Sequence, residues 1–244
     1  LSRGLGDVYK RQDPSDTLWE RLPGGAGDPL APASGGEDWA AMPALADLFP
    51  WQQPGIQFSR AWPVAPDPDT LRRRWQELLR ETDAEVRAHK YVTSRWGRNI
   101  HTVVQGMDPI SALAPSASHA PIVRLGWRSF DRQWTFDDPR LAKTDSPSLW
   151  QSWSTRQVYM VSPRSSRISG GPAVYASAYV PDLNSYFGSG GGKDVIPLYR
   201  DAEATQPNVT GGLLPLLGER YRQEVTPEDL AAYVMGVAGH DAYV

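Results

Sequence analysis

The sequence contains no cysteine among its 244 residues. This absence excludes disulfide scaffolds, cysteine-ligated zinc, iron–sulfur clusters and thiol catalysis. Long apolar runs are missing too, because no stretch approaches the roughly 20 residues that a helix needs to span a bilayer. The chain also does not open on an apolar secretory segment, so we expect a cytoplasmic protein with no membrane partner.

The motifs of common catalytic sites are absent as well. A phosphate-binding loop requires Gly-x-x-x-x-Gly-Lys-Ser/Thr, but Gly192 and Lys193 are followed by Asp194. There is no Gly-x-Ser-x-Gly nucleophile motif, and no Asn/Asp-Pro-Pro-Tyr/Phe motif of the kind that holds a flipped adenine in methyltransferases. The histidines lack the spacing of metal ligands: His89, His101, His119 and His240. We therefore expect no catalytic residue, no metal and no cofactor in this chain.

Glycine and proline, with 22 residues of each, predict many loops and few long helices. Residues 1–12 begin with Leu1 rather than Met and are similar to a translated sequencing adapter. We exclude them from the fold and expect the chain to continue a longer polypeptide. Residues 13–40 are rich in Gly, Pro, Asp and Ala, a composition that predicts a flexible linker.

The remainder divides into a lead-in segment at 41–120 and a folded domain at 121–244. Prolines and aromatic rings dominate the first part of the lead-in, which predicts irregular, extended chain. An amphipathic helix is predicted near 68–81, because Asp67 can cap its first turn. Its apolar stripe has helical spacing: Leu71, Trp75, Leu78 and Leu79.

The folded domain is predicted to be α+β, with a small mixed or antiparallel sheet and flanking helices. Alternating apolar residues indicate strands at 122–127, 133–136, 157–161, 173–179 and 195–199. Pro197 has no N–H for a ladder, so the last strand should lie at a sheet edge. Helices are expected at 213–221 and after the capping residue Thr226. The last helix has an apolar stripe that we expect to be buried: Leu230, Tyr233, Val234 and Val237.

Charge is segregated along the chain, although the net charge is only -3. Residues 56–170 hold 17 Lys and Arg against 11 Asp and Glu, whereas residues 1–55 hold 4 against 8 and residues 171–244 hold 4 against 9. Fifteen of the middle cations are arginine, whose planar fork pairs with phosphate and with guanine. The excess fits a local nucleic-acid-binding face, and it also fits a solvated helix face with scattered ion pairs.

Several separated motifs are more distinctive than the composition. They read GWRSFDRQW at 126–134, DPRL at 138–141, SPSLW at 146–150, RQVY at 156–159, DLFPWQQPG at 47–55 and TPEDLAAYV at 226–234. Together they resemble the C-terminal specificity domain of type ISP restriction–modification enzymes, over roughly residues 39–244.

This resemblance implies that the chain recognises a target sequence in double-stranded DNA, with 121–244 as the target-recognition domain. It also implies a parent polypeptide with nuclease, helicase-like and adenine-methyltransferase domains, which uses S-adenosylmethionine, ATP and Mg²⁺. The middle of the chain offers basic, hydroxyl and amide side chains for phosphates and base edges. The candidate DNA contacts are Arg128, Arg132, Gln133, Arg140, Lys143, Ser154, Arg156, Gln157, Arg164 and Arg167.

Some residues of the chain also fit other roles. Arg132 follows Asp131, so it can instead pair with an acid and hold the fold. A metal-dependent nuclease would use Asp137, Asp138 or Asp182 as ligands. An aromatic-rich carbohydrate- or protein-binding module would use the tryptophans, but such a site does not need the arginine excess.

Overall fold

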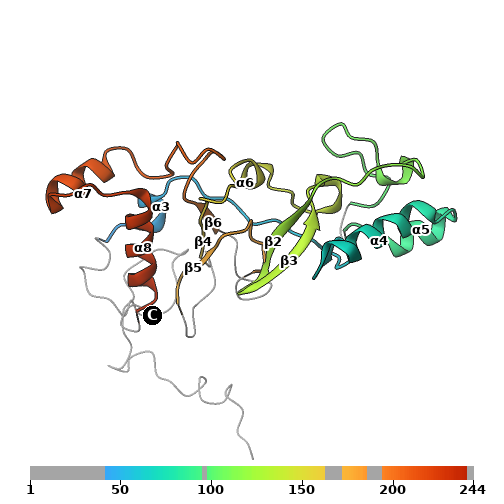
Figure 1. The fold of residues 1–244 in the computed structure, drawn as a ribbon, viewed down its shortest axis with the longest axis horizontal. Coiled ribbons are helices and arrows are strands. Elements are labelled where there is room, and N and C mark those ends of the chain that lie inside the picture. The colour runs from blue at the N-terminus through green and yellow to red at the C-terminus, as the bar shows by residue number, and fades with distance from the viewer. Residues whose placement is uncertain (1–41, 95–97, 163–171, 186–193, 241–244) are drawn as a thin grey trace, which may run out of the picture. The chain divides into compact units, whose positions relative to one another are not determined.

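The computed structural model describes residues 42–94, 98–162, 172–185 and 194–240 (Figure 1). The chain divides into two units, and the second, Leu45–Val244, carries every helix and strand described below. Its helices are α3 (Leu45–Leu48), α4 (Pro68–Arg80), α5 (Ala84–Lys90), α6 (Pro147–Gln151), α7 (Leu213–Tyr221) and α8 (Pro227–Ala238), with the 3-10 turns η1 (Ile110–Ala112) and η2 (Pro139–Leu141). In this described part, no helix has both the length and the apolar character required to cross a membrane.

Two small antiparallel sheets organise the unit. The strands are β1 (Val64–Ala65), β2 (Ile122–Arg128), β3 (Asp131–Phe136), β4 (Tyr159–Ser162), β5 (Tyr175–Ser177) and β6 (Asp194–Pro197). One sheet has the order β1-β3-β2 and the other the order β5-β4-β6. This confirms the predicted α+β fold and the five predicted strands. Pro197 indeed lies in an edge strand, β6, whereas the two-residue β1 was not predicted because its sequence is too short to show an alternation.

An extended segment at 53–57 connects the two sheets. Gln53 exchanges backbone hydrogen bonds with Val195 of β6, at 3.1 and 2.8 Å. Ile56 donates to the Pro181 carbonyl at 3.0 Å, and Gly126 of β2 donates to the Val180 carbonyl at 3.0 Å. The segment that follows β5 thus lies between β2 and residue 56. The lead-in therefore packs with residues 121–244, because it supplies both β1 and this connection.

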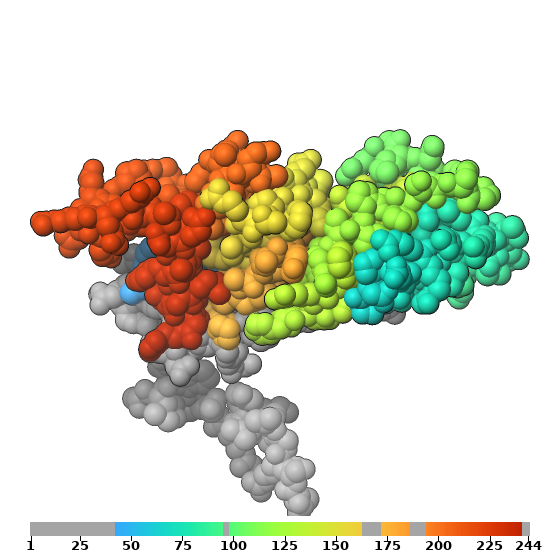
Figure 2. All heavy atoms as spheres, viewed as in Figure 1, coloured from blue at the N-terminus to red at the C-terminus, as the bar shows by residue number. Residues whose placement is uncertain are grey.

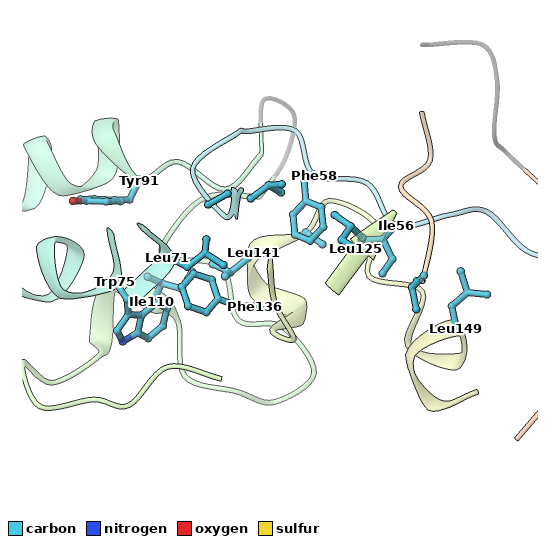
Figure 3. Packing of buried hydrophobic residues seen from close by; sticks show 14 of the residues in the cluster. Ile56, Phe58, Leu71, Trp75, Tyr91, Ile110, Leu125, Phe136, Leu141 and Leu149 are labelled. Atoms are coloured by element: carbon cyan, nitrogen blue, oxygen red, sulfur yellow. The ribbon is translucent and has the colours of Figure 1, made fainter. Parts of the chain in front are cut away.

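Helix α4 forms where the sequence predicted it. The Asp67 side chain accepts a hydrogen bond from the Thr70 N–H at 2.7 Å, and Pro68 occupies the first turn, where its missing N–H costs nothing. Leu71, Trp75 and Leu78 are buried on one face. Figure 3 shows the packed side chains of Leu71 and Trp75, with the Trp75 ring beside Phe136 of β3 at a centroid distance of 5.3 Å. The helix therefore covers the end of β3 that is far from the β2–β3 turn.

Helix α8 corrects one sequence prediction. Its capping box is present, because Thr226 and Asp229 bond each other's backbone N–H. Leu230 and Val234 are buried as expected, but Tyr233 is 70% exposed and Val237 is 37% exposed. Small residues take their place on the buried face, since Ala231 and Ala238 are 5% and 4% exposed. The prediction was wrong for Tyr233 and Val237, because it selected large apolar side chains and left out the small ones.

Replacing Gly55 by alanine is expected to lower the free energy of unfolding by about 1–3 kcal/mol, the usual penalty for overpacking. A Cβ at Gly55 would lie 2.8 Å from the Pro181 carbonyl oxygen and 3.0 Å from the Leu183 nitrogen, and neither backbone atom can rotate away. Urea unfolding measures the loss. Gly211→Ala is the matched control, because a Cβ there meets nothing within 4 Å. Equal costs for the two variants would contradict the described packing.

Candidate nucleic-acid interface

The β2–β3 hairpin carries the most basic of the predicted motifs on a two-residue turn. Arg128 pairs with Asp131 in the strand register, so Ser129 and Phe130 form the turn. The register shifts between Gly126 and Arg128, which is a bulge. Bulges increase the local twist and re-aim nearby side chains. In Figure 1 the turn lies at the end of the hairpin away from α4, and in Figure 2 the yellow-green atoms of the hairpin reach the surface.

Each of three arginines on this hairpin stacks on an aromatic ring. The guanidinium carbons of Arg124 and Arg128 lie 4.1 Å from the ring centroids of Trp134 and Trp127, respectively. Arg132 lies 5.7 Å from the ring centroid of its partner, the half-buried Tyr179. We call these three side chains, Arg124, Arg128 and Arg132, the arginine cluster.

The strand register explains the stacking. Arg124 lies opposite Trp134, and Gly126 lies opposite Arg132, and residues directly opposite share one face of an antiparallel pair. Gly126 has no side chain, and a Cβ there would lie 2.9 Å from Ser177 Oγ and 3.5 Å from the Tyr179 carbonyl oxygen. The missing side chain thus allows Tyr179 to approach Arg132. Stacking covers one face of a guanidinium and leaves its in-plane N–H groups for phosphate or base oxygens.

Arg128 also forms an ion pair with a buried carboxylate. Its Nη1 lies 2.6 Å from Asp182 Oδ1, and the two side chains are 42% and 1% exposed. Burial raises the pKa of Asp182 to about 6, while Arg128 and the Asn184 N–H oppose that shift. The carboxylate therefore holds part of the arginine's hydrogen-bonding capacity, and Arg124 and Arg132 are the less engaged members of the cluster.

Ser154 and Arg156 lie on a second segment, between α6 and β4. Arg156 is 63% exposed and 3.8 Å from Glu228, a separation that stabilises little at an exposed site. Ser154 Oγ accepts the Arg156 N–H at 3.3 Å. In the same segment, Trp153 Nε1 donates to the Ala178 carbonyl at 3.3 Å. Ala178 precedes Tyr179, so this second segment joins the chain that supports the arginine cluster.

Arg140 and Gln157 are corrected by the structure, because both lie in the interior. Arg140 is 8% exposed and binds both oxygens of Asp138, with Nη2–Oδ2 at 2.6 Å and Nε–Oδ1 at 2.9 Å. Gln157 is 2% exposed, and its amide donates to the carbonyls of Ser152 and Tyr199. These hydrogen bonds lie within the fold, so we assign both side chains a structural role.

The other predicted DNA contacts are either half-buried or outside the described residues. Gln133 is half-buried on β3 and donates to Asp131 at 2.8 Å. Lys143 is half-buried, and its backbone N–H donates to the Gln57 carbonyl at 2.7 Å. Arg164 and Arg167 lie outside the described residues.

Two of the three acidic residues of the nuclease hypothesis form ion pairs within the fold. Asp138 and Asp182 each hold an arginine, and burial together with Asp138 raises the pKa of Asp137. Within the described ranges, no group of three or more His, Asp or Glu side chains is placed to hold a metal ion.

The sequence did not point to two surface residues of the hairpin. Arg124 was treated only as part of a strand, and its stacking on Trp134 depends on a pairing register that the alternation does not reveal. Phe130 is 92% exposed at the hairpin turn, although the turn lacks the Gly or Asn that usually marks one. A large apolar residue between Arg128 and Arg132 was the available signal.

The chain was compared with known proteins. The model of the type ISP C-terminal specificity domain matches residues 47–244. A cryoEM structure of a DrdV–DNA complex is 19% identical with a TM-score of 0.51, over 80% of this chain and 20% of that chain. A nuclease-deletion mutant of the type ISP restriction–modification enzyme LlaGI, in complex with a DNA substrate mimic, is 12% identical with a TM-score of 0.45, over 72% of this chain and 16% of that chain. No curated protein matches.

The chain thus spans 20% or less of the length of these solved relatives. The likeness to the DrdV complex shows a shared fold. The family match covers most of the chain and includes both sheets, the β2–β3 hairpin and helices α4 to α8. This chain therefore belongs to the family of type ISP C-terminal specificity domains.

Proposed function

We propose that this chain recognises a DNA target sequence, in the cytoplasm, as the specificity part of a type ISP restriction–modification polypeptide. The family match over residues 47–244 carries this proposal. Both solved relatives were determined with DNA or a DNA mimic. The stacked arginine cluster supplies the chemistry, because oriented guanidinium groups bind phosphates and guanine edges.

The proposal assigns catalysis to other domains of the parent polypeptide. This chain performs no catalytic step and binds no cofactor of its own. Nuclease, helicase-like and adenine-methyltransferase domains of the parent polypeptide would use S-adenosylmethionine, ATP and Mg²⁺. The chain would select the DNA site at which they act.

A selection experiment tests the proposal. The 244-residue chain is mixed with a pool of random-sequence duplexes, and the bound fraction is sequenced and titrated at two salt concentrations. We expect one enriched sequence motif. The logarithm of affinity should fall with the logarithm of salt with a slope near -2.7 or steeper, since three neutralised phosphates contribute about -0.9 each. Binding that is independent of salt, or a bound pool without an enriched motif, would contradict target recognition.

A further inference from the structure

The side chain of Phe130 projects from the turn of the β2–β3 hairpin. It is 92% exposed, the highest exposure among the large hydrophobic side chains of the described chain. Its neighbours in the strand register are Arg128 and Asp131. An isolated apolar residue on a surface is ordinary, but this ring is at the end of a ribbon that also carries the arginine cluster.

The backbone of Phe130 is held in an unfavourable conformation. Its φ is +64°, in the left-handed region that glycine and asparagine adopt readily and a side chain with a bulky ring does not. Among the described residues, no other ring stacks on it. The ring therefore adds strain to the turn without a packing contact that offsets it. Strain of this kind is concentrated at functional sites, where a ligand supplies the missing contact.

The surroundings indicate which ligand. Arg128 and Arg132 flank the turn, and their guanidinium groups are fixed on Trp127 and Tyr179 at 4.1 and 5.7 Å. A two-stranded ribbon fits into a groove of duplex DNA. With the two arginines on the phosphates, the ring at the end of the ribbon would be directed at the stacked bases. Apolar side chains of proteins that bind the minor groove enter base steps as wedges and unstack them, which is the chemistry open to an exposed ring beside DNA.

We propose that Phe130 inserts between neighbouring base pairs of the bound duplex and locally unwinds it. This inference rests on the proposed function, because it requires DNA on the arginine cluster. Insertion buries the exposed ring against two π-faces, which the free protein cannot do. It also gives the specificity domain a means to sense how easily a base step deforms, in addition to the hydrogen bonds that read base edges.

A plasmid relaxation experiment tests the wedge without knowledge of the target sequence. A closed circular plasmid is relaxed by a topoisomerase in the presence of saturating chain, and the linking number is measured after protein removal. Wild type is expected to lower the linking number in proportion to bound protein, and Phe130→Ala to abolish that change. Affinity for a random-sequence duplex should fall about 10- to 100-fold in the variant, since stacking on bases has about that effect.

Two further variants separate the wedge from a structural role. Phe130→Trp keeps an aromatic ring and should preserve the unwinding. Phe130→Gly removes the ring and relieves the backbone strain, so it should unwind no DNA while its thermal unfolding midpoint is equal to or above that of wild type. A lower midpoint for Phe130→Gly would show a packing role and overturn the proposal.

The outcomes also separate this inference from the proposed function. A wild-type chain that binds no duplex would overturn both. A wild-type chain that binds with an unchanged linking number would overturn the wedge alone. Loss of affinity in Phe130→Ala without any change in unwinding would likewise overturn it, since the ring would then contact base edges from within the groove, for example a thymine methyl group.

Discussion

Replacing Arg124 and Arg132 together by glutamine is expected to weaken duplex binding roughly 100-fold or more at low salt, because each of the two charge-assisted contacts contributes about 1.5 kcal/mol or more. The slope of log affinity against log salt should also become shallower by about 1.8, the share of two phosphates. Fluorescence anisotropy with a labelled random duplex, titrated at several salt concentrations, measures both quantities.

The control variant removes the same charge from another surface. Arg73 and Arg80 are exposed on α4, which packs on the opposite end of β3 from the hairpin turn. Their joint replacement by glutamine should change affinity by less than about threefold, because exposed charges farther away than a Debye length of about 10 Å are screened. Equal losses for the two double variants would show a response to net charge alone and would contradict a localised interface.

The arginine cluster also shows which parts of a site the sequence reveals. The strands themselves were predictable, because alternation is a local property. The stacking of Arg124 on Trp134 is not local, since these residues meet only through the β2–β3 register. The Arg132 contact further requires Gly126 and the approach of Tyr179 from the chain after β5. The sequence therefore predicted which segment is basic, but not which aromatic rings orient its arginines.

The fold was predictable to a similar depth. Helix α4 has a local cap and a local apolar stripe, and it was located to within a residue at its end. Arg140 and Gln157 show the opposite case. Nothing in the neighbouring sequence distinguishes an arginine that faces DNA from one enclosed by Asp138 and the Asp108 carbonyl. Burial of polar side chains depends on the tertiary arrangement, which the neighbouring sequence does not reveal.

Replacing Asp138 by alanine is expected to lower the free energy of unfolding by about 3–5 kcal/mol, the usual effect of leaving a buried charge without its partner. The side chains of Arg140 and Asp138 are only 9% and 0% exposed. Asp138 Oδ1 also accepts the Arg140 backbone N–H at 3.0 Å, so the variant loses the cap of η2 as well. Urea unfolding followed by tryptophan fluorescence measures the change.

Asp137→Ala is the matched control, because it removes the adjacent carboxylate, at a residue more exposed than the buried Asp138. Burial and the negative charge of Asp138 both raise the pKa of Asp137, so its ionised form is disfavoured in the folded chain and its removal should cost little stability. A second variant separates charge from shape: Arg140→Met in the Asp138→Ala background should recover part of the loss, since it removes the cation that lacked a partner. Equal destabilisation by Asp137→Ala and Asp138→Ala would contradict the buried pair. Recovery in the double variant would show that Arg140 has a structural role.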